Sequence, residues 1–150
     1  MNYWLMKSEP EAFSIDDLQR MKVGGWDGVR NYQARNHMRA MKKGDRALFY
    51  HSSVNPPAVV GSMEIAREAY PDPTQFDPGN VHHDPKSPRS APRWSQVDVK
   101  FIEKFPKPMP LGKIRETPAL KNMVLVKRGR LSVQPVTPSE WNTILKSCRA

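Results

Sequence analysis

Tyr3-Trp4-Leu5-Met6-Lys7-Ser8-Glu9-Pro10, near the start of the chain, is an apolar run that turns polar and ends at a proline. A short apolar run with such a boundary predicts a buried β-strand. Because side chains alternate along a strand, Ser8 shares a face with Trp4 and Met6, and Lys7 lies on the opposite face. A buried hydroxyl at the end of this strand needs a partner, and the polar edge of a ligand can be that partner.

Capping signals predict three helices. Ser14 and Asp17 have the spacing of a capping box, as have Thr137 and Glu140. Asn31 is a third N-cap residue, and Gly44 follows the helix that it would start. The predicted helices are residues 15–21, ended by Gly24-Gly25, residues 32–42, and a helix after Thr137, with a helical turn at 117–118.

Further apolar runs predict four more strands, at residues 46–51, 59–65 or on to 70, 94–102, and 131–133. The prolines of residues 107–110 are expected to end the third of these. The proline-rich residues 71–92 have almost no apolar periodicity and predict a long loop. Strands with short helices between them predict an α+β fold, with a strongly curved sheet or small barrel, in one domain over residues 1–150.

The composition favours a soluble protein with an anionic partner. The 150 residues include 24 Lys and Arg against 15 Asp and Glu, a net charge of +9. Nucleic acid is the leading partner for such a surplus, and a merely solvated basic surface is the alternative. No apolar run approaches the ~20 residues of a membrane helix, no signal peptide is recognisable, and the single cysteine, Cys148, excludes an internal disulfide. We therefore expect a cytoplasmic protein with no membrane partner.

No catalytic, metal or cofactor motif is present in the sequence. There is no nucleophile elbow, phosphate-binding loop, dinucleotide fingerprint or zinc-protease motif. His82-His83-Asp84 has no further His or Cys nearby, so it is interpreted as a solvated loop. The rival hypothesis is an enzyme acting on nucleotides or RNA, with Glu9, His51 or Asp98 as acid or base. We expect no metal and no cofactor.

Aromatic and basic residues give better signals for binding. Trp26 and Trp94 lie in polar, turn-rich contexts, where a tryptophan can stack on a nucleobase, or can cover the core beneath a loop. Basic residues gather in two groups with few acids between them: Arg30, Arg35, Arg39, Lys42, Lys43 and Arg46, and then Lys121, Lys127, Arg128 and Arg130. The amide side chains of Asn31, Gln33 and Asn36 are suited to contacts with base edges.

Several segments in order resemble the EVE domain family. They are the opening stretch, residues 26–36 (Trp-Asp-Gly-Val-Arg-Asn-Tyr-Gln-Ala-Arg-Asn), Gly44-Asp45 with 49–52, Val60-Gly61, Tyr70-Pro71-Asp72 with Phe76-Asp77, Trp94 with 97–99, and 131–136. The resemblance implies a PUA-like fold, with a curved mixed sheet and short helices, related to the YTH readers of methylated adenine. It also implies binding of modified bases, particularly modified cytosine in DNA. Lys7-Ser8, Trp26 and Trp94 match, in order, the residues that build the base pocket in the YTH relatives.

The hypothesis from sequence is a monomeric, non-catalytic module that binds a modified base in DNA or RNA, with a small nucleotide-like ligand as a further alternative. The expected base pocket comprises Lys7, Ser8, Trp26, Asn31, Trp94, Leu131 and Ser132. The expected phosphate contacts are Arg30, Arg35, Arg39 and Lys43.

Overall fold

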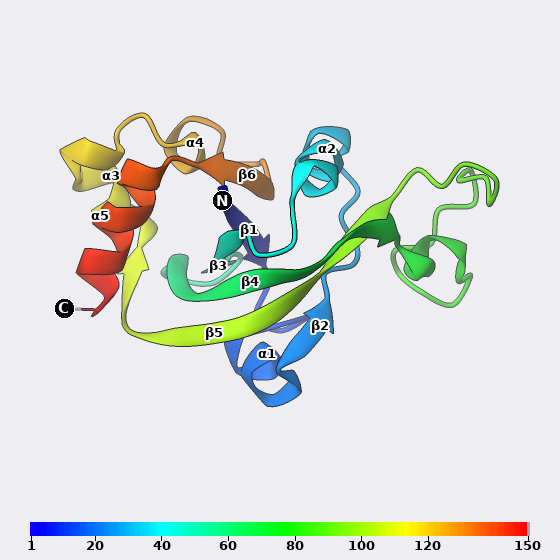
Figure 1. Cartoon of the computed structure of the whole chain (residues 1–150), viewed down its shortest axis with the longest axis horizontal. Helices are drawn as coiled ribbons and strands as arrows, with labels where there is room; N and C mark the ends of the chain where they lie inside the picture. The colour runs from blue at the N-terminus through cyan, green and yellow to red at the C-terminus, as the bar shows by residue number, and fades with distance from the viewer. Residues whose placement is uncertain (150) are drawn as a thin grey trace.

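The computed structural model describes residues 1–149, which form one six-stranded sheet with short helices around it (Figure 1). The strands are β1 (Tyr3–Ser8), β2 (Val23–Gly25), β3 (Arg46–His51), β4 (Ala58–Pro71), β5 (Ser95–Pro110) and β6 (Val133–Val136). The helices are α1 (Ile15–Met21), α2 (Tyr32–Ala40), α3 (Leu111–Glu116), α4 (Val124–Lys127) and α5 (Pro138–Arg149), with 3-10 turns at Pro73–Phe76 and Pro118–Leu120.

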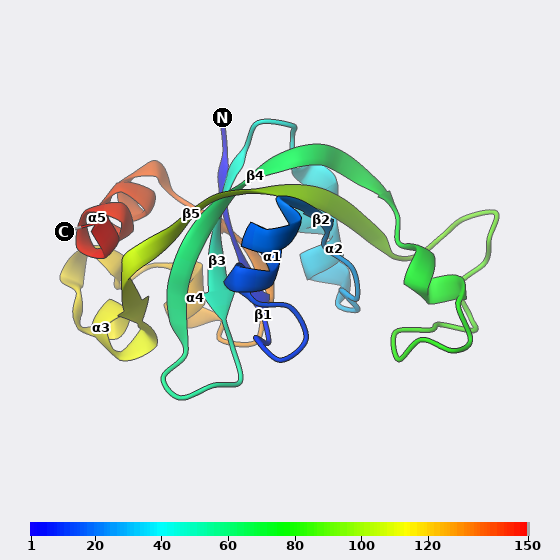
Figure 2. The ribbon, with the colours of Figure 1, turned by 90° about the horizontal axis from the view of Figure 1, so that it is seen from below.

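The sheet is mixed, curled and open. Its strand order is β2-β5-β4-β3-β1-β6, so β2 and β6 are its two edges. β1 and β3 are parallel, and every other neighbouring pair in the order is antiparallel. The pairing of the long strands β4 and β5 shifts register at several points, and the two strands bend together across the molecule (Figure 2). The α+β fold with a strongly curved sheet is confirmed, and its edges leave the barrel unclosed.

Both faces of the sheet are buried, which explains the apolar runs in its central strands. Trp4 and Met6 of β1 belong to one hydrophobic cluster, together with α1 and α2 residues such as Leu18 and Met38. Leu5 lies between them in sequence and belongs to a second cluster, which includes Trp141 of α5. The alternation along β1 therefore places Ser8 on the side of the first cluster, as the sequence predicts.

The capped helices form where their signals predict them. In α1, Ser14 and Asp17 make the reciprocal capping-box hydrogen bonds. Asn31 caps α2 by accepting from the Ala34 amide, and Thr137 and Glu140 pair in the same way at the start of α5. The expected end of the second helix was wrong, because α2 stops at Ala40 and Met41 turns into an extended conformation.

The strand boundaries needed more correction. Gly24-Gly25 does not merely end a helix but forms β2, which pairs with residues 98–100 of β5. β5 continues through its prolines to Pro110, because prolines two residues apart can all face the edge that β2 leaves unpaired there. The last strand is Val133–Val136 and not 131–133, and the short helices α3 and α4 have no capping side chain that could have predicted them.

Residues 72–94 form a lobe that projects beyond the ends of β4 and β5, at the opposite end of the molecule from α5 (Figures 1 and 2). This is the long loop expected from sequence, with one 3-10 turn at Pro73–Phe76. The lobe has its own buried polar centre, in which Gln75 bonds to Asp72, Ser87 and Trp94. Within residues 1–149, no helix has both the length and the apolar character needed to cross a membrane.

Candidate nucleic-acid interface

An open pocket of about 610 Å³ lies where the end of β1, the end of β2 and the loop at residues 26–31 meet. Its wall comprises Lys7, Ser8, Glu9, Ala12, Phe13, Met21, Gly25, Trp26, Asp27, Gly28, Val29, Arg30, Asn31, His82 and Ser132. Five of the seven predicted base-pocket residues are therefore brought together. Leu131 lines a neighbouring hollow with Asn31, and Trp94 lines neither.

Trp26 belongs both to the pocket and to the hydrophobic core. Its side chain is buried, and its ring meets Phe13 edge-on at 5.9 Å and Phe49 at 5.2 Å between ring centroids. Its backbone N–H donates to the carbonyl of Val97 in β5. The sequence left open whether Trp26 stacks on a base or covers the core beneath a loop, and its burial against Phe13 and Phe49 shows that it is part of the core.

Trp94 anchors the lobe and does not form part of the pocket wall. Its ring is buried, stacks on Tyr32 at 4.9 Å, and donates its indole N–H to Asp84 over 2.7 Å. The Arg30 guanidinium lies 5.4 Å from the same ring. These partners leave the expected stacking of Trp94 on a base without structural support.

Lys7 and Ser8 line the pocket, but their polar groups are partly engaged. The Ser8 hydroxyl donates to the carbonyl of Phe13 over 2.6 Å, so only its lone pairs are left for a ligand. The Lys7 ammonium donates to the carbonyl of Gly129, and its backbone N–H donates to Ser132. Burial lowers the pKa of Lys7, and no carboxylate among residues 1–149 forms an ion pair with it.

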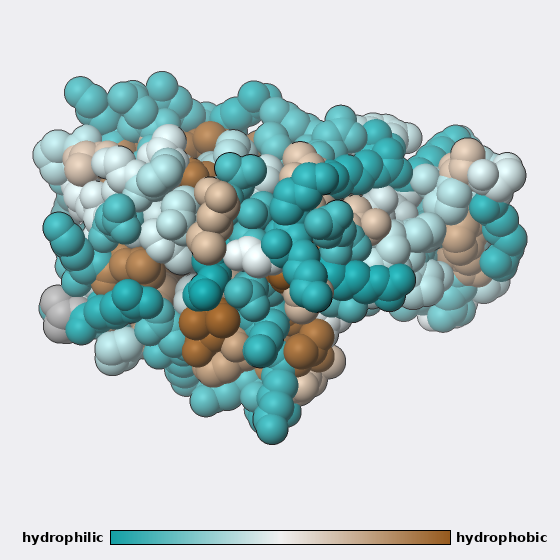
Figure 3. Space-filling model, in the orientation of Figure 1, coloured by the Kyte–Doolittle hydropathy of each residue, from teal (hydrophilic) through white to brown (hydrophobic). Residues whose placement is uncertain are grey.

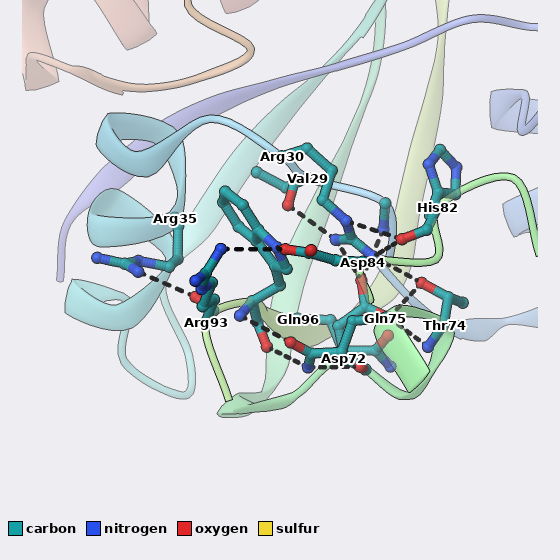
Figure 4. A network of polar contacts seen from close by, with 12 residues as sticks. Val29, Arg30, Arg35, Asp72, Thr74, Gln75, His82, Asp84, Arg93 and Gln96 are labelled. Carbon is teal, nitrogen blue, oxygen red and sulfur yellow. Dashed lines mark hydrogen bonds and ion pairs between the residues drawn. The ribbon is translucent and has the colours of Figure 1, made fainter. Parts of the chain in front are cut away.

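Arg30 connects the pocket loop to the lobe (Figure 4). Its guanidinium makes five hydrogen bonds, to the carbonyls of Val29 and His82 and to the side chains of Asp72 and Thr74. A guanidinium has five N–H donors, so none is left for a phosphate. The expected role of Arg30 in phosphate binding is therefore not supported.

Asp72 is the fully buried partner of Arg30. Burial tends to raise the pKa of its carboxyl, but hydrogen bonds from Thr74, Gly28 and Arg30 outweigh burial and hold the pKa below its usual value. The Gly28 amide belongs to the pocket wall, so the Asp72 carboxylate fixes the shape of that wall from the lobe side.

The other expected phosphate contacts lie along α2 and after it, outside the pocket wall. Arg35 donates to Asn36 and to the carbonyl of Arg93, and Arg39 donates to Ser95 and to the carbonyls of Pro92 and Arg93. These two side chains hold the end of the lobe against α2. Lys43 is exposed, and within residues 1–149 only its backbone makes a hydrogen bond, to Glu68.

Among the pocket residues missed from sequence, Asp27 and His82 have polar side chains. Asp27 lines the pocket, and desolvation and then the charge of Asp72 raise the pKa of its carboxyl. The His82 ring lies against Gly28, where an added Cβ would be 2.6 Å from Nε2 and where φ is +78°. Asp27 adjoins Trp26 in sequence and could have been inferred from it. His82 could not, because only the fold brings the lobe to this wall.

The three candidate acid–base residues do not form one site. Glu9 lines the pocket, but His51 accepts the Ile15 amide at the start of α1 on its Nε2, and Asp98 accepts the Tyr70 hydroxyl. Neither His51 nor Asp98 is part of the pocket wall.

Most of the face in Figure 3 is hydrophilic, with small separate hydrophobic patches, some of them around α1 and β2. Met21 and Val23 are exposed apolar residues of these two elements, and Met21 lines the pocket.

The chain is similar to proteins from animals, protozoa and bacteria. Mouse thymocyte nuclear protein 1 is 48% identical over an alignment of 163 residues, and this alignment covers 96% of this chain and 72% of the relative. The structure of a hypothetical protein from Leishmania major superposes with a TM-score of 0.95 at 47% identity and covers 97% of this chain and 93% of that one. The structure of human THYN1 protein in complex with DNA containing 5-methylcytosine superposes with a TM-score of 0.93 at 45% identity. It covers 97% of this chain and 96% of that one.

The word "nuclear" in the names of these relatives contradicts the cytoplasmic location expected from the sequence. The profile of the EVE domain matches residues 2–147 of the chain. With this match and relatives at 45–48% identity, the chain belongs to the EVE domain family.

Proposed function

We propose that this chain is a non-catalytic module that binds a modified cytosine in DNA, with the base in the pocket beside Trp26. The observation that carries the proposal is the match, at a TM-score of 0.93, to a structure that holds 5-methylcytosine DNA. The pocket described above combines an aromatic wall with polar side chains.

The wall suits a flat, flipped-out base. Stacking on an aromatic side chain contributes about 1–3 kcal/mol per base, which offsets much of the few kcal/mol needed to take a base out of the stack. Phe13 and Trp26 form the aromatic part of this wall. A methyl group adds only an apolar contact, so discrimination for the modification is expected to be about 1–3 kcal/mol.

Asp27 gives the pocket a means to recognise cytosine. Its carboxylate makes no hydrogen bond with another side chain of residues 1–149, and a carboxylate accepts readily from the exocyclic amino group of cytosine. Thymine has the same methyl group but presents a carbonyl oxygen at that position, which a carboxylate repels.

The function is tested by binding to oligonucleotides of one sequence with a single variable base. We expect affinity in the order 5-methylcytosine, cytosine, thymine, measured by fluorescence anisotropy at fixed salt. Equal binding of thymine and 5-methylcytosine would contradict cytosine recognition. The same series in RNA compares the two polymers, and a steep salt dependence separates a polymer ligand from a small nucleotide.

Replacing Asp27 with alanine is expected to weaken binding of 5-methylcytosine DNA by about 1–3 kcal/mol. The raised pKa of Asp27 means that it loses its charge at a higher pH than an ordinary carboxyl group. Wild-type affinity for cytosine should therefore already fall as the pH drops toward this raised pKa. Asp27→Asn is the control, because any pH dependence that remains in it belongs to the base. Identical pH profiles for both proteins would rule out this role of Asp27.

A further inference from the structure

We propose that residues 128–132 form a saddle over which the DNA strand passes, with the two phosphates next to the pocketed nucleotide held on its two sides. The inference rests on the proposed function, because it starts from a base in the pocket. It adds the route of the strand and the residues that hold it.

Two hollows flank the saddle. One of about 300 Å³ includes Arg128, Gly129, Arg130 and Leu131, and shares Asn31 with the base pocket. The other, of about 510 Å³, includes Gly129, Arg130 and Ser132, and shares Lys7 with the base pocket. The pocket therefore adjoins a hollow on each side of the saddle. A nucleotide within a strand is linked to a phosphate on its 5′ side and to another on its 3′ side, so a pocket that holds it must be open in two directions. A free base has no such requirement.

The saddle is fixed to the sheet through β1. The Lys7 amide donates to the carbonyl of Ser132 over 2.9 Å, and its ammonium donates to the carbonyl of Gly129. At the saddle's other end, the Leu131 amide donates to the carbonyl of Arg128. These bonds hold a turn whose side chains extend from a fixed backbone.

The saddle carries cations with no internal partner. Arg128 and Arg130 are exposed, and neither guanidinium forms a hydrogen bond or an ion pair with any of residues 1–149. This distinguishes them from Arg30, Arg35 and Arg39, which bind the protein itself. Arg130 borders both hollows, Arg128 borders the smaller one, and Lys7 borders the larger one.

Two further titratable groups bear on the charge of the hollows, His37 and Glu9. Arg128 lines the smaller hollow together with Gln33 of α2. In the same helix, burial and then the charge of Arg128 lower the pKa of His37. Glu9 borders the larger hollow, and its carboxylate accepts the Ser53 hydroxyl. Lys7 and Arg130 leave a net positive charge there, and phosphodiester oxygens are the anions that DNA brings to such a site.

The test compares 5-methyldeoxycytidine with its 5′-phosphate, its 3′-phosphate and a trinucleotide that has it in the centre. We expect each phosphate to improve wild-type affinity roughly tenfold, as charge-assisted hydrogen bonds do. Arg130→Ala should lose most of both gains, and Arg128→Ala should lose one of them. Both variants should bind the unphosphorylated nucleoside as the wild type does. Lys146→Ala is the control, since this exposed lysine lies in α5, away from the saddle (Figure 1).

Equal losses in Lys146→Ala and Arg130→Ala would overturn the saddle, because they would show a general effect of charge. Unchanged phosphate gains in Arg130→Ala would overturn it as well. If the wild type binds oligonucleotides but not the nucleoside, the base pocket is the part that fails. The salt dependence then decides the saddle: the log–log slope for single-stranded DNA should fall by about 0.7 for each phosphate that the Arg130→Ala variant no longer binds, and an unchanged slope would exclude it.

Discussion

Trp26→Ala is expected to lower the free energy of unfolding by about 3–5 kcal/mol, as large-to-small substitutions of buried aromatic residues do. The indole is buried against Phe13 and Phe49, so its removal leaves a cavity beneath the pocket. Removing the pocket wall should also abolish selective binding of 5-methylcytosine. Unfolding in urea measures the first effect, and oligonucleotide titration measures the second.

Trp26→Phe separates the two effects. A phenyl ring fills much of the cavity, so the loss of stability should be smaller than in the alanine variant. The smaller ring offers less stacking surface, and base affinity should therefore fall while the protein remains folded. A urea midpoint for Trp26→Ala that equals the wild-type midpoint would show that the ring contributes nothing to the core.

Asp72→Ala is the second substitution with a large expected effect, about 3 kcal/mol of unfolding free energy. Removing one partner of a buried ion pair leaves the other charge without compensation. Here the Gly28 amide would lose its acceptor, and Arg30, whose side chain is 23% exposed, would lose its ion-pair partner. Because Gly28 belongs to the pocket wall, base affinity should fall as well, although Asp72 itself does not line the pocket.

Asp77→Ala is the matched control for Asp72→Ala. Asp77 is an exposed carboxylate in the same lobe, and among the described residues its side chain accepts only the local Gly79 amide. Its removal should change stability by about 0.5 kcal/mol or less. Equal effects of the two substitutions would contradict the central role given to Asp72.

The ion pair of Asp72 with Arg30 also predicts how the stability of the protein depends on pH. The pKa of Asp72 is lower in the folded protein than its ordinary value of 3.8, so the folded state favours the charged form. The contribution of Asp72 to the free energy of unfolding is therefore complete above the pKa of its carboxyl in the unfolded chain. It is lost as the pH falls through the lowered pKa of the folded state. The stability difference between wild type and Asp72→Asn should shrink in this acid range and remain constant above it.

Features of the fold that depend on neighbours in sequence could be predicted from the sequence. The start of α1 follows from Ser14 and Asp17, which are three residues apart and complete their hydrogen bonds locally. The alternation along β1 likewise follows from one strand alone. The extension of β5 to Pro110 could not be predicted, because it depends on which edge of the strand lacks a neighbour.

For the candidate site too, what could be predicted depends on whether a residue's neighbours are close to it in sequence. Lys7, Ser8 and Trp26 lie together in the pocket wall, as the short motifs that carry them indicate, and their contact with a base stays a prediction. Trp94 and Arg30 were misassigned because their partners are far along the chain: the Arg30 guanidinium meets Asp72, 42 residues away. A tryptophan or arginine in a polar loop looks the same in sequence whether it faces a ligand or a buried carboxylate.

The position of β1 between β3 and β6 has a consequence for synthesis of the protein. β1 precedes the other strands of the sheet in the sequence, yet its two partners lie at residues 46–51 and 133–136. The strand that carries Lys7 therefore has one unpaired edge until β6 has been synthesised. Such long-range pairing slows folding and leaves an exposed strand edge during translation. The nascent chain should therefore need protection by a chaperone most during the interval between the synthesis of β3 and that of β6.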